Sequence, residues 1–319
     1  MFSRVKSVCL SPQALAAGAC FLVAVVVTAN VQTAGDGQWY WYATVLLAGK
    51  KLYSDLHAVL QPLFVLETAA FIKLLGRSWI ASKVPALIHA SFLALGIRLV
   101  VRHSHWPALN QAGVIAGTFF LWIFFGGFRF DDYHALTGCF VVYSTLSLLS
   151  LEGCSDSRRA LRLAAGLGLL CGLAITTRLN DGLLLFLTVA FLIPFLSRAS
   201  RLACMCVSTA VAAGVIVLVV SLTGDSFRDY INNTVFHAAG SKGGMGALVL
   251  YPILLPLRAL RYLFIERETE LCLLGLLGLA ASWPLLIRRI RWPGTLGWIA
   301  KGAVWAIPAL GFRTGRCAA

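Results

Sequence analysis

Hydrophobic residues gather in long continuous runs along most of the chain, and short polar segments separate these runs. A helix needs about 17–25 predominantly apolar residues to cross the hydrocarbon layer of a bilayer. Runs of this kind predict spanning helices at 11–30, 79–101, 109–127, 135–151, 161–177, 181–197, 202–222, 270–287 and, more weakly, 294–311. We favour an uncleaved first span over a signal peptide, because the first run is long and Ala34-Gly35 is a poor cleavage site. The pattern predicts an all-α, polytopic transmembrane bundle of about 9–11 apolar segments.

Two further apolar runs are interrupted by prolines and charged residues. The run at 58–76 contains Gln61, Pro62, Glu67 and Lys73, and the run at 246–265 contains Pro252, Pro256, Arg258 and Arg261. Lipid-exposed helices rarely carry such residues without a partner or a functional reason. These two runs are therefore the best candidates for helices that do not cross the membrane.

Clusters of basic residues fix the expected topology, because lysine and arginine accumulate in cytoplasmic loops. Five clusters fall between apolar runs: Arg4/Lys6, Arg98/Arg102, Arg158/Arg159/Arg162, Arg198/Arg201 and Arg288/Arg289/Arg291. All five share one side only if the interrupted runs lie on, or dip into, the opposite face. Interfacial helices then lie on the non-cytoplasmic face. Four polar segments share this face, namely 31–57, 128–134, 178–180 and 223–245.

Composition supports a membrane protein and excludes a soluble or disordered chain. Hydrophobic residues make up 59% of the 319 residues and charged residues only 13%, against about 25% charged in typical soluble domains. The net charge of +14 could suggest nucleic acid, but basic residues between apolar runs set topology and meet lipid phosphates instead. The nine cysteines form no CxxC pair and no zinc-ligand spacing, so we predict no metal site.

The first polar segment contains an acid followed by an aromatic helix. Trp39, Tyr42, Ala43 and Leu46 have the spacing of one helical face and suit the membrane interface. Asp36 comes just before them, where it could simply cap the helix. It could instead hold a carboxylate beside a lipid-borne substrate, and the sequence leaves both readings open.

The other polar segments carry further candidate binding residues. The pair Asp131–Asp132 lies between Arg129 and His134, so either an ion pair or a binding site accounts for it. Arg178 stands against the positive-inside tendency and could bind phosphate or pair with Asp181. A glycine-rich stretch around Lys242 could wrap phosphate oxygens or form an ordinary surface loop. The remaining candidates are Tyr53, Asp55 and Arg228.

The first segment resembles the integral-membrane glycosyltransferases of the C-type (GT-C) fold. The similarity lies in the order of Asp36, an aromatic helix, "LLAGKKLYSD", "QPLF" and a run ending in "LLG". The chain resembles especially the branch that contains the protein O-mannosyltransferases and the aminoarabinose transferase of lipid A. Gly37 stands where many relatives have a second acid, and Gln61 where they have a proline.

The resemblance implies a single membrane domain over 1–319. A GT-C-like module would cover 1–222, and the outer loop and C-terminal spans would cover 223–319. Relatives are generally longer, which makes this chain either a truncated or an abbreviated member. The same resemblance implies a multi-pass location, most simply the bacterial inner (plasma) membrane, with the active site on the periplasmic or outer face.

The implied activity is transfer of a sugar from a polyprenyl-phosphate donor to an acceptor hydroxyl, with inversion. Asp36 would be the catalytic base. The expected partners are that donor, a lipid, glycan or protein acceptor, and membrane lipids, without nucleic acid. No cofactor is expected, and the missing second acid gives a divalent metal no support. The substrate-binding set would comprise Tyr53, Asp55, Asp131, Asp132, His134, Arg178, Arg228 and Lys242.

Three other functions compete with this one, and the first two lack a feature in the sequence: there is no internal repeat, and the outer loop at 223–245 is small. A transporter or flippase of lipid-linked sugars would place polar groups near the bilayer midplane, in repeated halves. A ligase or polymerase of surface glycans would have a larger outer loop. A degenerate transferase-like scaffold would tolerate every substitution at Asp36.

Overall fold

The regular structure is helical in every part of the chain that the computed structural model describes. These parts are residues 11–30, 34–58, 60–78, 80–103, 107–125, 133–152, 154–196 and 201–237. The chain divides into two compact units, residues 1–238 with 306–319 and residues 239–305. All described residues belong to the first unit. The predicted spans at 270–287 and 294–311 and the interrupted run at 246–265 lie outside the described residues.

Seven helices of at least 18 residues form the long elements of the described part. At about 1.5 Å rise per residue, each is long enough to approach the thickness of the hydrocarbon layer. They are α2 (Pro12–Asn30), α5 (Ile80–Arg102), α6 (Ala108–Phe125), α7 (Tyr133–Leu151), α8 (Ser157–Thr177), α9 (Leu179–Leu196) and α10 (Arg201–Ser221).

Five of these helices are long and apolar enough to cross a membrane, namely the larger part of α5 together with α7, α8, α9 and α10. Their positions match the apolar runs, which confirms the predicted polytopic helical bundle. Five such helices are compatible with a multi-pass integral membrane protein.

The interrupted run at 58–76 forms a helix that is too short to cross. Helix α4 (Pro62–Leu75) has 14 residues and a length of about 21 Å, against about 30 Å of hydrocarbon. Pro62 occupies the first helical position, where its missing N–H costs nothing. Gly76, with φ of 80°, ends the helix in a conformation that glycine adopts at low cost.

Three further short elements lie near α4. Helix α3 (Ala34–Leu47) packs against α4, and α11 (Phe227–Ile231) follows α10 and continues into the π-helical turn η1 (Asn232–His237). On α3, Trp39 and Ala43 are buried whereas Trp41 is 51% exposed. The predicted face of α3 therefore packs inward, and a second aromatic face remains open.

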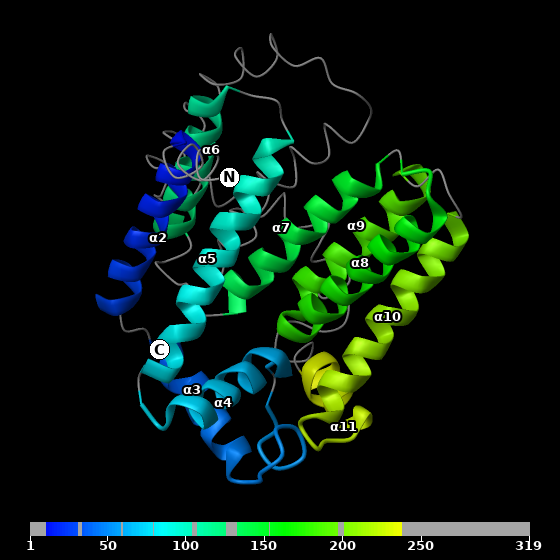
Figure 1. Cartoon of the computed structure of the whole chain (residues 1–319). Coiled ribbons are helices and arrows are strands. Elements are labelled where there is room, and N and C mark those ends of the chain that lie inside the picture. Colours follow the sequence, from blue (N-terminus) through cyan, green and yellow to red (C-terminus); the bar gives the residue numbers. More distant parts are fainter. Residues whose placement is uncertain are drawn as a thin grey trace, which may run out of the picture. The chain divides into compact units, whose positions relative to one another are not determined.

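The long helices pack in two neighbouring groups (Figure 1). Helices α7, α8, α9 and α10 form one group, α2, α5 and α6 form the other, and α5 packs against α7. The closest approaches are between backbones. A Cβ on Gly168 of α8 would lie 2.3 Å from the carbonyl oxygen of Ser208 on α10, and one on Gly182 of α9 would lie 2.3 Å from the Ile175 nitrogen. A Cβ on Gly172 would likewise lie 2.8 Å from the Ala212 carbonyl oxygen on α10, so both glycines of this α8 pair allow close helix packing.

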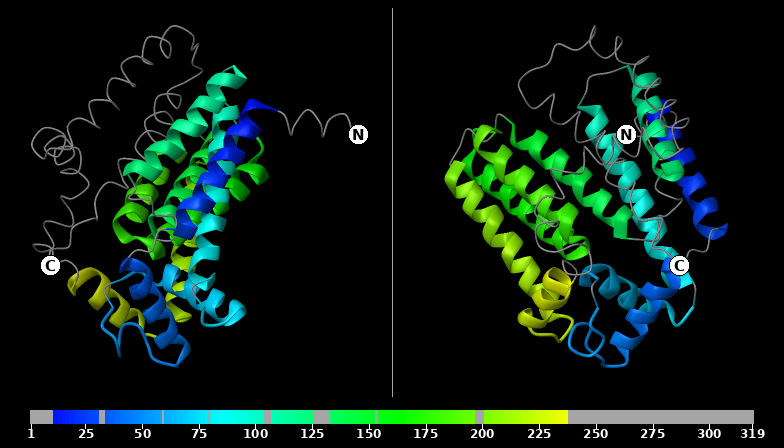
Figure 2. Two further views of the ribbon diagram at one scale, coloured as in Figure 1. Left: turned by 90° about the vertical axis from the view of Figure 1, so that its left-hand side faces the viewer. Right: turned by 180° about the vertical axis from the view of Figure 1, so that it is seen from behind.

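The polar connections gather at one end of these helices (Figures 1 and 2). There, α3 and α4 adjoin α5, α4 contacts α8 and α10, and α10 continues into α11. Two basic residues mark the other end of the bundle. Arg102 is the last residue of α5, and Arg201 is the first residue of α10. Of the four segments predicted to share one face, the described parts 34–57, 133–134, 178–180 and 223–237 gather at one end, and the other residues of these segments lie outside the described residues.

Candidate functional site

The predicted catalytic acid belongs to the first turn of α3. The helix begins at Ala34, so Asp36 is its third residue. The sequence pattern predicted that the helix begins just after Asp36, and this predicted helix start is wrong by about one turn. The Asp36 side chain lies outside the described residues. Its backbone position is one helical turn upstream of Trp39.

Trp39 links α3 to two other elements. Its ring makes edge-to-face contacts with Phe64 on α4 and with Tyr133 at the start of α7, each with a centroid distance of 5.2 Å. Edge-to-face pairs of this kind add about 0.5–1.5 kcal/mol beyond the burial of area. The first turns of α3 therefore lie beside the start of α7, although about 95 residues separate them in sequence.

Tyr133 also joins the predicted cation to this group. The His134 ring stacks on Tyr133 at a centroid distance of 4.2 Å, and the Arg178 guanidinium lies 5.7 Å from the centre of the Tyr133 ring. A guanidinium within about 6 Å of an aromatic face is attracted by the ring quadrupole. Two predicted binding residues, His134 and Arg178, are thus brought together on one tyrosine.

Arg178 forms an ion pair with Asp181 at the turn between α8 and α9. The two side chains are only 15% and 10% exposed. The sequence had left phosphate binding and this ion pair as alternatives for Arg178, and the pair exists. A guanidinium is a planar group with five N–H donors, a geometry that suits carboxylate and phosphate oxygens.

A carboxylate that the sequence analysis did not single out holds the loop after α3. The backbone N–H groups of Leu52, Tyr53 and Ser54 donate to the carboxylate of Asp225 at 3.0, 3.2 and 2.9 Å, and the Ser54 hydroxyl donates at 3.0 Å. Successive backbone N–H groups form a concave anion site, and here an internal side chain fills it. Asn233 donates to the Tyr53 carbonyl at 3.2 Å from the other side. The segment after α10 is thereby fastened to the loop after α3.

Tyr53, predicted as a substrate contact, lies in the core of this region. Its side chain is fully buried, its hydroxyl donates to the Leu60 carbonyl at 3.0 Å, and its ring makes an edge-to-face contact with Tyr230. The Tyr230 hydroxyl in turn donates to Gln61 Oε1 at 2.7 Å. Burial raises the pKa of Tyr53 well above its ordinary value and raises the pKa of Tyr230 to about 12.

These raised pKa values predict a loss of stability at high pH. A tyrosine whose folded pKa is above its unfolded value of 10.0 stabilises the fold fully below pH 10, and this contribution falls as pH rises through the folded pKa. Tyr230 alone would account for about 2 kcal/mol by pH 12. We expect the thermal midpoint in detergent to fall steeply between pH 10 and 12. Tyr230→Phe should start lower, because it loses the bond to Gln61, but should fall less steeply; equal slopes would contradict the assignment.

Glu67 on α4 and His89 on α5 form a second buried polar contact. The Nε2 atom of His89 lies 2.8 Å from Glu67 Oε1, and the His89 side chain is almost wholly buried. The other carboxylate oxygen of Glu67 is buried without a hydrogen-bond partner. Ionisable groups within apolar helices are costly and usually functional. In the sequence, this contact was indicated only by the presence of an acid and a histidine inside apolar runs.

The remaining predicted residues divide between surface and undescribed positions. Asp55 is exposed and accepts the Lys51 N–H at 2.9 Å, and Arg228 is exposed on α11. Asp131, Asp132 and Lys242 lie outside the described residues. Within the described part of the chain, no cluster of three or more His, Cys, Asp or Glu residues could hold a metal ion.

Comparison of the chain with protein-family models, with curated proteins and with solved structures found no match.

Proposed function

We propose that this protein is a membrane glycosyltransferase that uses a polyprenyl-phosphate sugar. The observation that supports the proposal is the convergence of separate polar segments on Tyr133. Trp39 comes one turn after Asp36 on α3, and it contacts the same tyrosine as Arg178 and His134. An acid-bearing helix and a cation thus adjoin at the end of the bundle where a lipid head group would lie.

The proposed step is an in-line displacement at the anomeric carbon. The acceptor hydroxyl oxygen forms a bond to that carbon as its bond to the lipid phosphate oxygen breaks, which inverts the configuration. Asp36 takes the hydroxyl proton as general base, and the leaving group departs as polyprenyl phosphate. General base catalysis requires one placed carboxylate, and a positive charge near the phosphate stabilises the departing anion. Arg178 supplies that charge, with His134 beside it.

The proposal is tested by assaying the purified protein in detergent with labelled polyprenyl-phosphate mannose and polyprenyl-phosphate arabinose. Serine- and threonine-rich peptides and an extract of membrane lipids serve as acceptors. We expect labelled sugar to appear on one acceptor class, with equimolar release of polyprenyl phosphate. Absence of transfer and of donor cleavage across this set would contradict the proposal.

Replacement of Arg178 should weaken donor binding. A hydrogen bond to a charged group contributes about 1.5–3 kcal/mol, so Arg178→Gln should reduce donor affinity by roughly tenfold or more while acceptor affinity changes little. The matched control is Asp181→Asn, which removes the ion pair but keeps the Arg178 charge. Titration of a fluorescent polyprenyl-phosphate sugar measures both variants. Equal losses in the two would mean that Arg178 acts only through the pair.

The Glu67–His89 contact favours a second candidate, a transporter of lipid-linked sugar. His89 lies about 9 Å into the candidate span Lys83–Arg102, within the apolar part of α5. Transporters place their ionisable groups at such depths. Proteoliposomes separate the two functions: a transporter would move the labelled donor between leaflets without cleaving it, whereas a transferase would cleave it.

A further inference from the structure

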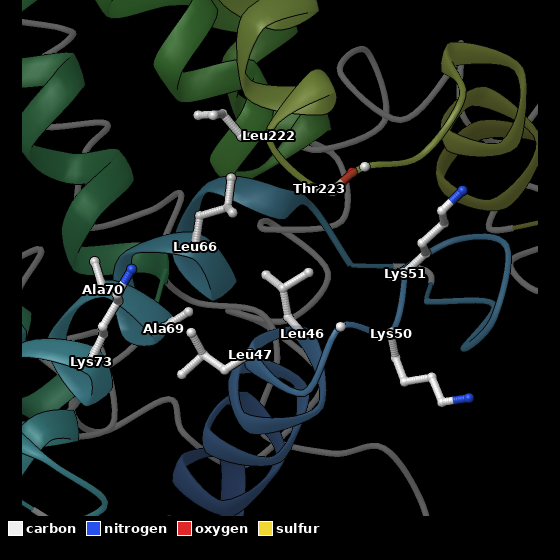
Figure 3. Close-up of a pocket in the computed structure, with 12 residues that line it drawn as sticks. Leu46, Leu47, Lys50, Lys51, Leu66, Ala69, Ala70, Lys73, Leu222 and Thr223 are labelled. Carbon is white, nitrogen blue, oxygen red and sulfur yellow. The ribbon is translucent and has the colours of Figure 1, made fainter.

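A groove of about 390 Å³ lies between the end of α3, α4 and the end of α10. Figure 3 shows Leu46, Leu47, Leu66 and Ala69 in the middle of this groove and Leu222 above them. Lys73 lies on the α4 side, and Lys50 and Lys51 lie on the side of the loop after α3. The groove therefore combines an apolar floor with cations at both margins.

The charge around the groove is one-sided. Its lining, which lies entirely within the described residues, contains three lysines and no carboxylate. The nearest acids in sequence to Lys51 and Gly224 are not part of the lining, and each accepts backbone N–H groups of the loop after α3. Asp225 accepts the N–H groups of Leu52 to Ser54, and Asp55 accepts the Lys51 N–H. Three ammonium groups line one groove without a carboxylate in the lining, and their flexible stems allow them to turn toward an anion.

The surroundings of the groove identify the anion as one carried by a lipid. Leu222 is 63% exposed, and the preceding turns of α10 expose Leu218 and Val217. Helix α10 is a candidate span, so this exposed apolar strip leads from the hydrocarbon layer to the groove. Leu47 on α3, which lines the groove, is also exposed. A free phosphate would gain nothing from this apolar floor, whereas an acyl chain would cover it.

We propose that this groove binds an anionic membrane phospholipid. The phosphate head group lies among Lys50, Lys51 and Lys73, and an acyl chain lies along Leu46, Leu47 and Leu222. Basic residues near a membrane surface contribute about 1 kcal/mol each toward anionic lipid, or roughly fivefold in affinity. The groove shares no lining residue with the Arg178–Asp181 pair, so the proposal does not rest on the transfer reaction.

The test is photocrosslinking of the full-length protein in neutral detergent with a photoreactive phosphatidylglycerol, followed by mapping of the crosslinked peptides. We expect crosslinks in the peptides that span 44–51 and 66–73. The Lys50→Gln, Lys51→Gln, Lys73→Gln triple variant should reduce them by roughly tenfold or more, and the corresponding triple arginine variant should retain them. All three lysines are exposed, so both variants should fold.

Three controls make the result decisive. The Arg102→Gln, Arg158→Gln, Arg159→Gln variant loses the same charge at the opposite end and should leave these crosslinks unchanged. A photoreactive phosphatidylcholine with the same acyl chains should label the peptides weakly, and millimolar inorganic phosphate should not compete. Equal labelling by both lipids, equal loss in both glutamine variants, or displacement by inorganic phosphate would each overturn the proposal.

Discussion

Asp36→Asn is expected to abolish most sugar transfer while the protein folds normally. Removal of a general base costs about 10²–10⁴-fold in rate. Because Asp36 is the third residue of α3, its loss also removes a negative charge from the first helical turn. That interaction contributes only about 0.3–1 kcal/mol of stability, so a purely structural role predicts a small effect. The measurement is the initial rate of transfer by variant purified at normal yield.

The control for this variant is Asp156→Asn. Asp156 caps α8 at the opposite end of the bundle, where its side chain accepts the Arg158 N–H at 2.9 Å. Asparagine is as good a cap as aspartate, so both the rate and the stability should be retained. If Asp36→Asn transferred sugar at a rate near that of Asp156→Asn, the catalytic role of Asp36 would be wrong.

Asp225→Ala is expected to destabilise the fold by about 3–5 kcal/mol. The substitution leaves the N–H groups of Leu52, Tyr53 and Ser54 without their acceptor, and Leu52 and Tyr53 are buried. A hydrogen bond to a charged acceptor contributes about 1.5–3 kcal/mol, and an unsatisfied buried donor retains its full desolvation penalty. Equilibrium unfolding in mixed micelles of mild and denaturing detergent measures the loss.

Asp229→Ala is the matched control for Asp225. Asp229 lies four residues later and bonds only locally, accepting from the Ser226 hydroxyl at 2.6 Å. Its loss should cost about 1 kcal/mol or less. If Asp225→Ala were no more destabilising than Asp229→Ala, the connection between α10 and the loop after α3 would not stabilise the fold.

The spans could be predicted from the sequence because each depends on local composition. Apolar runs of sufficient length form helices wherever backbone groups have no water to bond, so the positions of α2 and α5 to α10 follow directly. The shortness of α4 could also be anticipated, since Pro62 fixes its start and the basic clusters require an even number of crossings.

The site could be predicted only in part, because its contacts join residues distant in sequence. The Arg178–Asp181 pair spans three residues on adjoining helical turns and was foreseen as an alternative. By contrast, Asp225 binds a loop more than 170 residues away, and Glu67 and His89 meet across two helices. No local pattern marks an aspartate that accepts three backbone N–H groups. The lysine groove was missed for the same reason, since α3, α4 and α10 each contribute part of its lining.

The close backbone contacts of α8 have a consequence for how this sequence can vary. Gly168 and Gly172 meet α10, and Gly182 meets the last turns of α8. Because main chain rests on main chain, the spacing of these helices is independent of the volume of the side chains on their outer faces. Apolar residues facing lipid can then exchange freely over evolutionary time without displacing Arg178. Homologues should therefore differ widely over the outer surface of α9 and α10 yet keep glycine, or at most alanine, at these three positions.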